Sequence, residues 1–170
     1  MATAATGQAF GRFTYLGSLM SRTIDALLLH RGASVLARIL LTFPFWGSGL
    51  DKLFGFDAAV AVLEGFGLRP GALFAAATVT VQLVGSALVI SNRLTWLGAG
   101  ALGIFTALTI PLVHRFWALD GEASVHAFHI AAEHVGMIGG LVTVSILAAL
   151  QRAARANPSR LPGSGAVALP

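Results

Sequence analysis

The fold is decided by residues 71–113, which read GALFAAATVTVQLVGSALVI, then SNR, then LTWLGAGALGIFTALTIPLV. Each apolar run has the length of about 20 residues that a helix needs to cross about 30 Å of hydrocarbon. The link between the two runs, at 91–93, has room only for a tight turn. We therefore expect these runs to form an antiparallel pair of membrane-spanning helices.

Two further apolar segments of similar length flank this hairpin, at 35–54 and 127–150. The chain of 170 residues is 56% hydrophobic and 11% charged, and its mean hydropathy is +0.80. Soluble domains carry about 25% charged residues, so this chain has too few polar side chains to cover a water-exposed globule. The sequence predicts an all-α fold, an integral membrane four-helix bundle.

The segments outside the four spans suggest three regions along the chain. In 1–32, apolar residues recur at helical spacing from Phe10 to Leu28, and Arg12 and Arg22 can reach lipid phosphates, which predicts an amphipathic helix on the cytoplasmic membrane surface. The bundle occupies 33–150, with a short extra helix expected at 57–66 between the first two spans. The remainder, 151–170, ends in Pro, Gly, Ser and Ala, and we expect a disordered C-terminal tail.

The distribution of charge predicts the orientation in the membrane. With the N-terminus in the cytoplasm, only Lys52, Arg69 and Arg115 of the eleven basic residues fall on the outer side. Cytoplasmic segments are normally the ones rich in Lys and Arg, so both termini are expected in the cytoplasm. The basic residues are scattered, which does not favour nucleic-acid binding. The chain has no cysteine, which excludes disulfides and thiolate metal sites.

Four ionisable residues stand near the start of the last span: His126, His129, Glu133 and His134. Ionisable groups inside a membrane are costly and usually face a protein interior, a cavity or a ligand. At about 100° per residue, the first three share one helix face and His134 lies about 80° to the side of His126. Glu133 is expected roughly 10 Å deeper in the membrane than the first turns.

A small-residue pair on the same helix, Gly136 and Gly140, would let another helix approach closely. We therefore expect the polar stripe to face protein or a cavity. The topology brings four other candidate groups into the outer half of the bundle. Each also has a simpler interpretation, as an interfacial anchor, a surface group or a link between helices. These four residues are Lys52, Gln82, His114 and Trp117.

Several short motifs resemble those of DoxX-type membrane proteins, in order and over about 35–150. They are RILL at 38–41, SGLDKL at 48–53, QLVG at 82–85, HRFW at 114–117 and GGL at 139–141. The resemblance implies a four-helix protein of the bacterial inner membrane, linked to thiosulfate:quinone oxidoreductase and to oxidoreductase complexes. Two departures, Gln82 for a frequent Glu and Glu133-His134 for a frequent Lys-Asn, leave the specific reaction open.

The favoured hypothesis is a quinone-linked oxidoreductase component. His129 would hydrogen-bond a quinone oxygen and Glu133 would relay the proton. The chain contains no visible electron carrier, so a redox partner protein is expected, besides membrane lipids. The groups expected around the quinone head are His114, His134, Trp117, Gln82, Lys52 and His126.

Two alternatives remain open, and so does the question of whether the chain is an enzyme. In one, His114 and a histidine of the last span hold haem or a metal. In the other, the chain is a non-catalytic anchor or assembly subunit of a redox or transport complex. A homo-oligomer is compatible with all three hypotheses.

Overall fold

The computed structural model describes residues 21–156, and its secondary structure in that range is helical. Residues 21–28 form a helix. The rest of the expected N-terminal helix, and the expected disordered tail at 157–170, lie outside the described residues. The chain divides into two compact units, 1–37 and 38–170.

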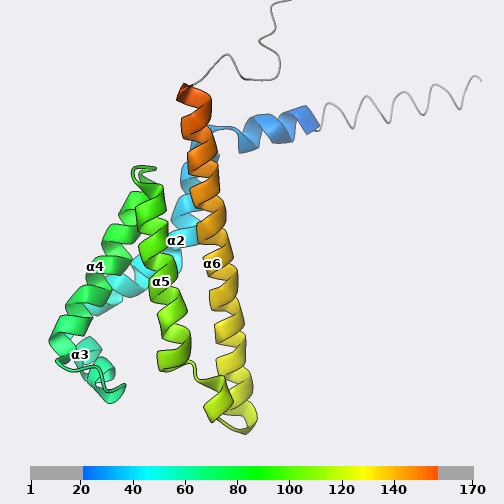
Figure 1. Cartoon of the computed structure of the whole chain (residues 1–170). Coiled ribbons are helices and arrows are strands. Elements are labelled where there is room, and N and C mark those ends of the chain that lie inside the picture. Colours follow the sequence, from blue (N-terminus) through cyan, green and yellow to red (C-terminus); the bar gives the residue numbers. More distant parts are fainter. Residues whose placement is uncertain (1–20, 157–170) are drawn as a thin grey trace, which may run out of the picture. The chain divides into compact units, whose positions relative to one another are not determined.

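Four helices are long and apolar enough to cross a membrane, which confirms the predicted four-helix membrane fold (Figure 1). They are α2 (Arg31–Phe54), α4 (Gly71–Ile90), α5 (Thr95–Val113) and α6 (Gly121–Ala156).

Two short elements connect the spans. The helix α3 (Phe56–Gly65) follows α2, as the sequence predicted, and the 3₁₀ turn η1 (Phe116–Ala118) precedes α6. The N–H of Gly71 donates to Oε1 of Glu64 at 3.2 Å, which ties the end of α3 to the start of α4. The first turn of a helix has N–H groups without intrahelical partners, and the Glu64 carboxylate satisfies one of them.

The hairpin of α4 and α5 is tightly packed because two glycines face each other. A Cβ at Gly98 would lie 2.6 Å from the carbonyl oxygen of Gly85, so the backbones approach as closely as only glycine permits. The turn between the helices uses positive φ at Asn92 and Leu94, 56° and 47°. The predicted antiparallel hairpin is confirmed (Figure 1).

The first span crosses the bundle from α6 to α4. Near its start, the side chain of Leu41 occupies the space beside Gly140, where a Cβ would lie 2.7 Å from Cδ1. Further along, a Cβ at Gly49 would lie 2.9 Å from Leu83 of α4. Of the glycine pair predicted on α6, only Gly140 makes a close approach, because no atom lies within 4 Å of a Cβ at Gly136.

The last span is longer at both ends than the predicted 127–150. It has 36 residues, which is about 54 Å of helix, whereas the hydrocarbon core is about 30 Å thick. Hydropathy detects only the apolar part of such a helix, and charged residues that form helices well extend it into the polar regions. Residues 151–156, expected in the tail, therefore belong to α6.

A buried network of side-chain hydrogen bonds, the polar knot, joins three helices at one end of the bundle. Arg38, 3% exposed, donates from Nη2 to Oε1 of Gln151 at 3.3 Å. The same oxygen accepts from Nδ2 of Asn92 at 3.2 Å, and Oδ1 of Asn92 accepts from the hydroxyl of Thr95 at 3.1 Å. The knot thus fixes the register of α2, α6 and the hairpin turn, and His114, where α5 ends, marks the opposite end of the bundle.

Candidate functional site

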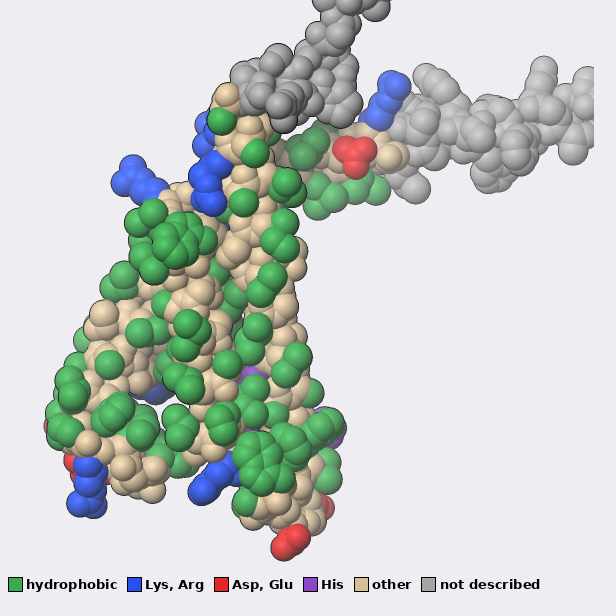
Figure 2. All heavy atoms as spheres, in the orientation of Figure 1, with side chains coloured by type: hydrophobic (Ala, Val, Ile, Leu, Met, Phe, Trp, Pro, Cys, Tyr) green, Lys and Arg blue, Asp and Glu red, His purple; other side chains and the backbone are tan. Residues whose placement is uncertain are grey.

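A cavity of about 610 Å³ lies between the helices of the second unit. Small-molecule sites in proteins commonly have volumes of about 300–1,000 Å³. Figure 2 shows this face of the molecule hollowed towards the end of the bundle away from the polar knot. The wall is mainly apolar and aromatic, and it includes Phe45, Phe66, Phe74, Phe105 and Met137.

Helical rise gives the position of the cavity along the bundle. Lys52, on its wall, lies about 21 Å along α2 from Arg38. His134, also on its wall, lies about 26 Å along α6 from Gln151. Lys52 and His134 therefore stand in the half of the bundle away from the polar knot, whereas Gln82 and Thr106 of the same wall lie near the middle of α4 and α5.

Gln82 is the most buried polar side chain on the cavity wall apart from Thr106. It is 4% exposed, and its Oε1 has no hydrogen-bond partner among the described residues. A buried acceptor without a partner costs about 1–3 kcal/mol. The interpretation of Gln82 as a link between helices gains no support from this oxygen, which is free to bind a ligand or water.

His114 and His134 meet edge to face on the same wall, with ring centroids 5.0 Å apart. The Nδ1 atom of His134 lies 2.7 Å from the carbonyl oxygen of Ile130. A carbonyl only accepts, so Nδ1 carries the proton, and Nε2 of the neutral ring is an acceptor. The backbone of α6 therefore sets the tautomer of His134.

Lys52 brings the positive charge to this cavity from α2. The side chain is half-buried, and Nζ donates to the hydroxyl oxygen of Ser48, which also lines the cavity. The simpler interpretation of Lys52 as a surface group does not match this hydrogen bond. Lys52 can offer its remaining N–H groups to an acceptor atom of a ligand.

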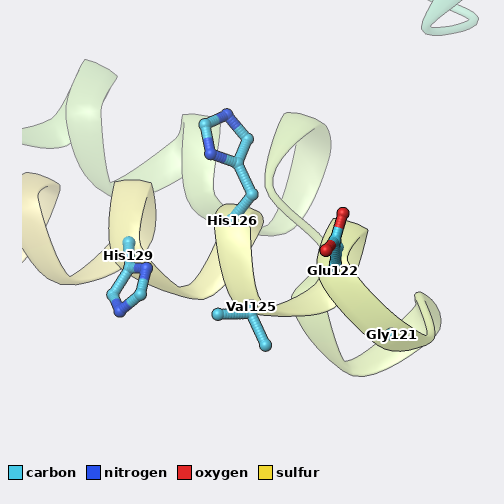
Figure 3. A pocket seen from close by; sticks show the side chains of 5 residues that line it. All are labelled: Gly121, Glu122, Val125, His126 and His129. Atoms are coloured by element: carbon cyan, nitrogen blue, oxygen red, sulfur yellow. The ribbon is translucent and has the colours of Figure 1, made fainter.

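The remaining four predicted site residues do not line the cavity. His126, His129 and Glu133 are exposed, and Trp117 is 59% exposed with its ring edge-on to Phe116. His126 and His129 border a separate surface depression at the start of α6, where their imidazoles point in different directions (Figure 3).

The rotation of α6 about its axis explains this outcome. Ala131 is buried against the rest of the bundle, and both His129 and Glu133 are two residues away, about 200° around the helix. The expectation that their stripe faces protein is therefore wrong within the single chain. His134, three residues from Ala131, shares its side of the helix and faces the cavity.

The position of Glu133 along α6 follows from its neighbour His134. Glu133 follows His129 on the exposed side and stands at the level of His134, whose ring meets His114 at the end of α5. Residues 121–132 therefore extend past the end of α5. By helical rise Glu133 lies about 10 Å from His126 along α6, and its greater depth in the membrane stays a prediction.

The side-chain geometry does not favour the haem or metal alternative. Within residues 21–156, no group of three His, Cys, Asp or Glu side chains is arranged to hold a metal ion. His114 and His134 are in ring contact, at 5.0 Å between centroids. Two imidazoles in contact leave no space between them for a porphyrin.

These observations define a class: a four-helix membrane protein with a ligand-sized cavity between its spans. Residues 33–115 match the family model DoxX, so this part of the chain is a DoxX family domain. The match covers α2 to α5 and ends before α6, so the likeness seen at 139–141 lies beyond it. Searches among curated proteins and among solved structures gave no match.

Proposed function

We propose that this protein binds a quinone or quinol in the cavity between its helices and serves as the quinone-linked component of an inner-membrane oxidoreductase. The observation that carries the proposal is the buried Oε1 of Gln82, which lacks a protein partner on the wall of an otherwise apolar cavity. A ligand that is largely apolar and carries a few polar atoms satisfies both features.

The chemistry of a quinone head group matches the distribution of groups on the wall. The ring is flat and apolar, which suits aromatic neighbours such as Phe45 and Phe105. Its two oxygens lie at opposite ends of the ring and need polar partners. Lys52 on α2 and His134 on α6 stand on different helices of the same cavity and can serve these oxygens separately.

The proposed roles of individual residues follow their positions. The Nδ1–H of His134 is bound to the carbonyl of Ile130, which leaves Nε2 as a hydrogen-bond acceptor. His134 therefore replaces His129 and Glu133 as the candidate for exchanging a proton with the ligand. His129 and Glu133 would act only where a second protein covers the exposed side of α6. Because the chain has no cysteine and no evident electron carrier, the electrons would come from a partner protein or a soluble reductant.

The proposed location is the bacterial inner membrane with both termini in the cytoplasm. In residues 38–156, the bundle end with the polar knot carries Arg38, Arg93, Arg152 and Arg155, and the acidic residues of this range all lie in other segments. Figure 2 shows basic side chains around this end, and at the opposite end it shows both basic and acidic ones. A bundle end with this charge normally faces the cytoplasm.

The direct test is to purify the full chain with native lipids and to identify bound quinone by absorbance and mass spectrometry. We expect a quinone to copurify, and Gln82→Met, which keeps the side-chain volume, to lower its occupancy. Thr80→Val on the same helix is the matched control, because Thr80 is exposed and donates to its own helix. A wild-type protein that holds no quinone and takes up none when it is added would contradict the proposal.

A second candidate function is a non-catalytic assembly subunit, favoured by the exposed His126, His129 and Glu133 on α6. A partner helix or loop with donor groups could pair with this surface. If this function is correct, Glu133→Ala should release a copurifying partner, while Gln82→Met should leave the assembly intact. Loss of quinone from Gln82→Met with no loss of partner would favour the first function.

A further inference from the structure

The polar side chains on one side of the cavity already donate their hydrogen-bonding protons to backbone carbonyls. The hydroxyl of Thr106 donates to the carbonyl of Leu102 at 2.8 Å, and the hydroxyl of Thr109 donates to the carbonyl of Thr106 at 2.8 Å. The Nδ1–H of His134 is used in the same way on α6, by the carbonyl of Ile130. These side chains can therefore only accept hydrogen bonds from a ligand, through their lone pairs.

Gln82 adds a further acceptor to this side. Its Oε1 is buried without a partner, while the amide group as a whole contains both a donor and an acceptor. A ligand hydroxyl, which donates and accepts, satisfies either end of the amide in either orientation. A ligand carbonyl only accepts, so it satisfies the amide nitrogen and leaves Oε1 without a partner.

The two redox forms of a quinone differ in whether their oxygens can donate hydrogen bonds. The oxidised form carries two carbonyl oxygens that only accept, whereas the quinol carries two hydroxyls. Opposite Oε1 of Gln82 and Nε2 of His134, a carbonyl oxygen would face acceptor atoms, and a hydroxyl would donate to them. The cation of Lys52, on α2, can donate to the oxygen of either form.

We propose that the cavity selects the reduced form, a quinol, through acceptance of its hydroxyl protons by Oε1 of Gln82 and Nε2 of His134. This inference rests on the proposed quinone-binding function and adds the redox state of the ligand to it. The preference should be at least about tenfold in dissociation constant, since one unmatched buried acceptor costs about that factor in binding.

The test compares both forms of one probe on the full chain in detergent, without oxygen. The probe is decylubiquinone and its chemically reduced quinol, with bound and free ligand separated and quantified by chromatography. We expect the quinol to bind at least about tenfold more tightly than the quinone. Gln82→Met should bring the ratio towards one, chiefly by weakening the quinol, and Thr80→Val should leave it unchanged.

The outcomes separate this inference from the function on which it rests. Equal affinities, or a tighter quinone, would overturn the selectivity and leave the quinone site in place. Binding of neither form would overturn the proposed function itself. The ratio in the unchanged protein decides the selectivity even if Gln82→Met does not fold, because that comparison needs no variant.

Discussion

His114 and His134 stand edge to face with ring centroids 5.0 Å apart, although one ends α5 and the other lies well inside α6. The contact places the end of the α4–α5 hairpin beside α6 on the wall of the cavity. Together with the polar knot of Arg38 and Gln151 at the other end, it sets how α6 lies along the bundle.

Replacement of His134 by Leu should reduce quinol binding about tenfold, because the Leu side chain offers no acceptor to a ligand hydroxyl. His129→Leu provides a control of the same residue type on the same helix, and it should leave binding unchanged since His129 is exposed and does not line the cavity. The measurement is quinol titration of the purified variants. The reverse result, loss of binding in His129→Leu alone, would place the ligand on the outer side of α6.

Glu133→Gln should leave quinone occupancy unchanged, because the carboxylate is exposed and points away from the cavity wall. Mass spectrometry of copurified quinone in wild-type and variant protein gives the comparison. A clear fall in occupancy would show that Glu133 contacts the ligand in an assembly of more than one chain. Chemical cross-linking in the membrane would then identify the second chain.

Gly98→Ala should destabilise the hairpin by about 1–3 kcal/mol, since the new methyl group would overlap a backbone oxygen that has no freedom to move aside. That oxygen belongs to Gly85 and would lie 2.6 Å from the added carbon. Gly100→Ala, two residues further along α5, has no atom within 4 Å of the added carbon. Thermal unfolding in detergent should show a lower midpoint for Gly98→Ala and no decrease for Gly100→Ala, because Ala favours helix.

Gln151→Leu should destabilise the bundle by about 1.5–3 kcal/mol, because it removes the acceptor from a buried guanidinium. The effect should be smaller when Arg38 has already been replaced by Met, since no buried charge is then left unpaired. A double-mutant cycle on thermal unfolding measures this coupling. Additive effects of the two substitutions would mean that the hydrogen bond between Arg38 and Gln151, 3.3 Å long, contributes nothing to stability.

The absence of cysteine from the chain allows single-cysteine labelling without background. A membrane-impermeant maleimide added to intact cells should label His126→Cys and should not label Arg155→Cys, which the positive-inside rule assigns to the cytoplasm. Val142→Cys, exposed near the middle of α6, should stay unlabelled from both sides because lipid covers it. Labelling of Arg155→Cys in intact cells would show that the C-terminal end of α6 faces outward, opposite to the predicted orientation.

The existence and pairing of the spans could be predicted from local features of the sequence. The length of an apolar run decides whether it crosses the membrane, and a link as short as 91–93 leaves only an antiparallel neighbour. The same kind of inference failed for the ends of α6, because a helix continues into polar residues where hydropathy no longer detects it. Gln82, His114, His134 and Lys52 were rightly placed together, since their depth follows from position along each span.

The sequence by itself therefore determined the number and antiparallel arrangement of the helices, together with the position of most polar groups along them. Only the tertiary structure decided which side of α6 faces inward, and hence that His134 rather than His129 or Glu133 reaches the cavity. In water, an apolar stripe marks the buried side of a helix. In lipid, both the bundle interior and the surroundings are apolar, so the pattern does not distinguish them, and packing around small residues such as Ala131 sets the rotation.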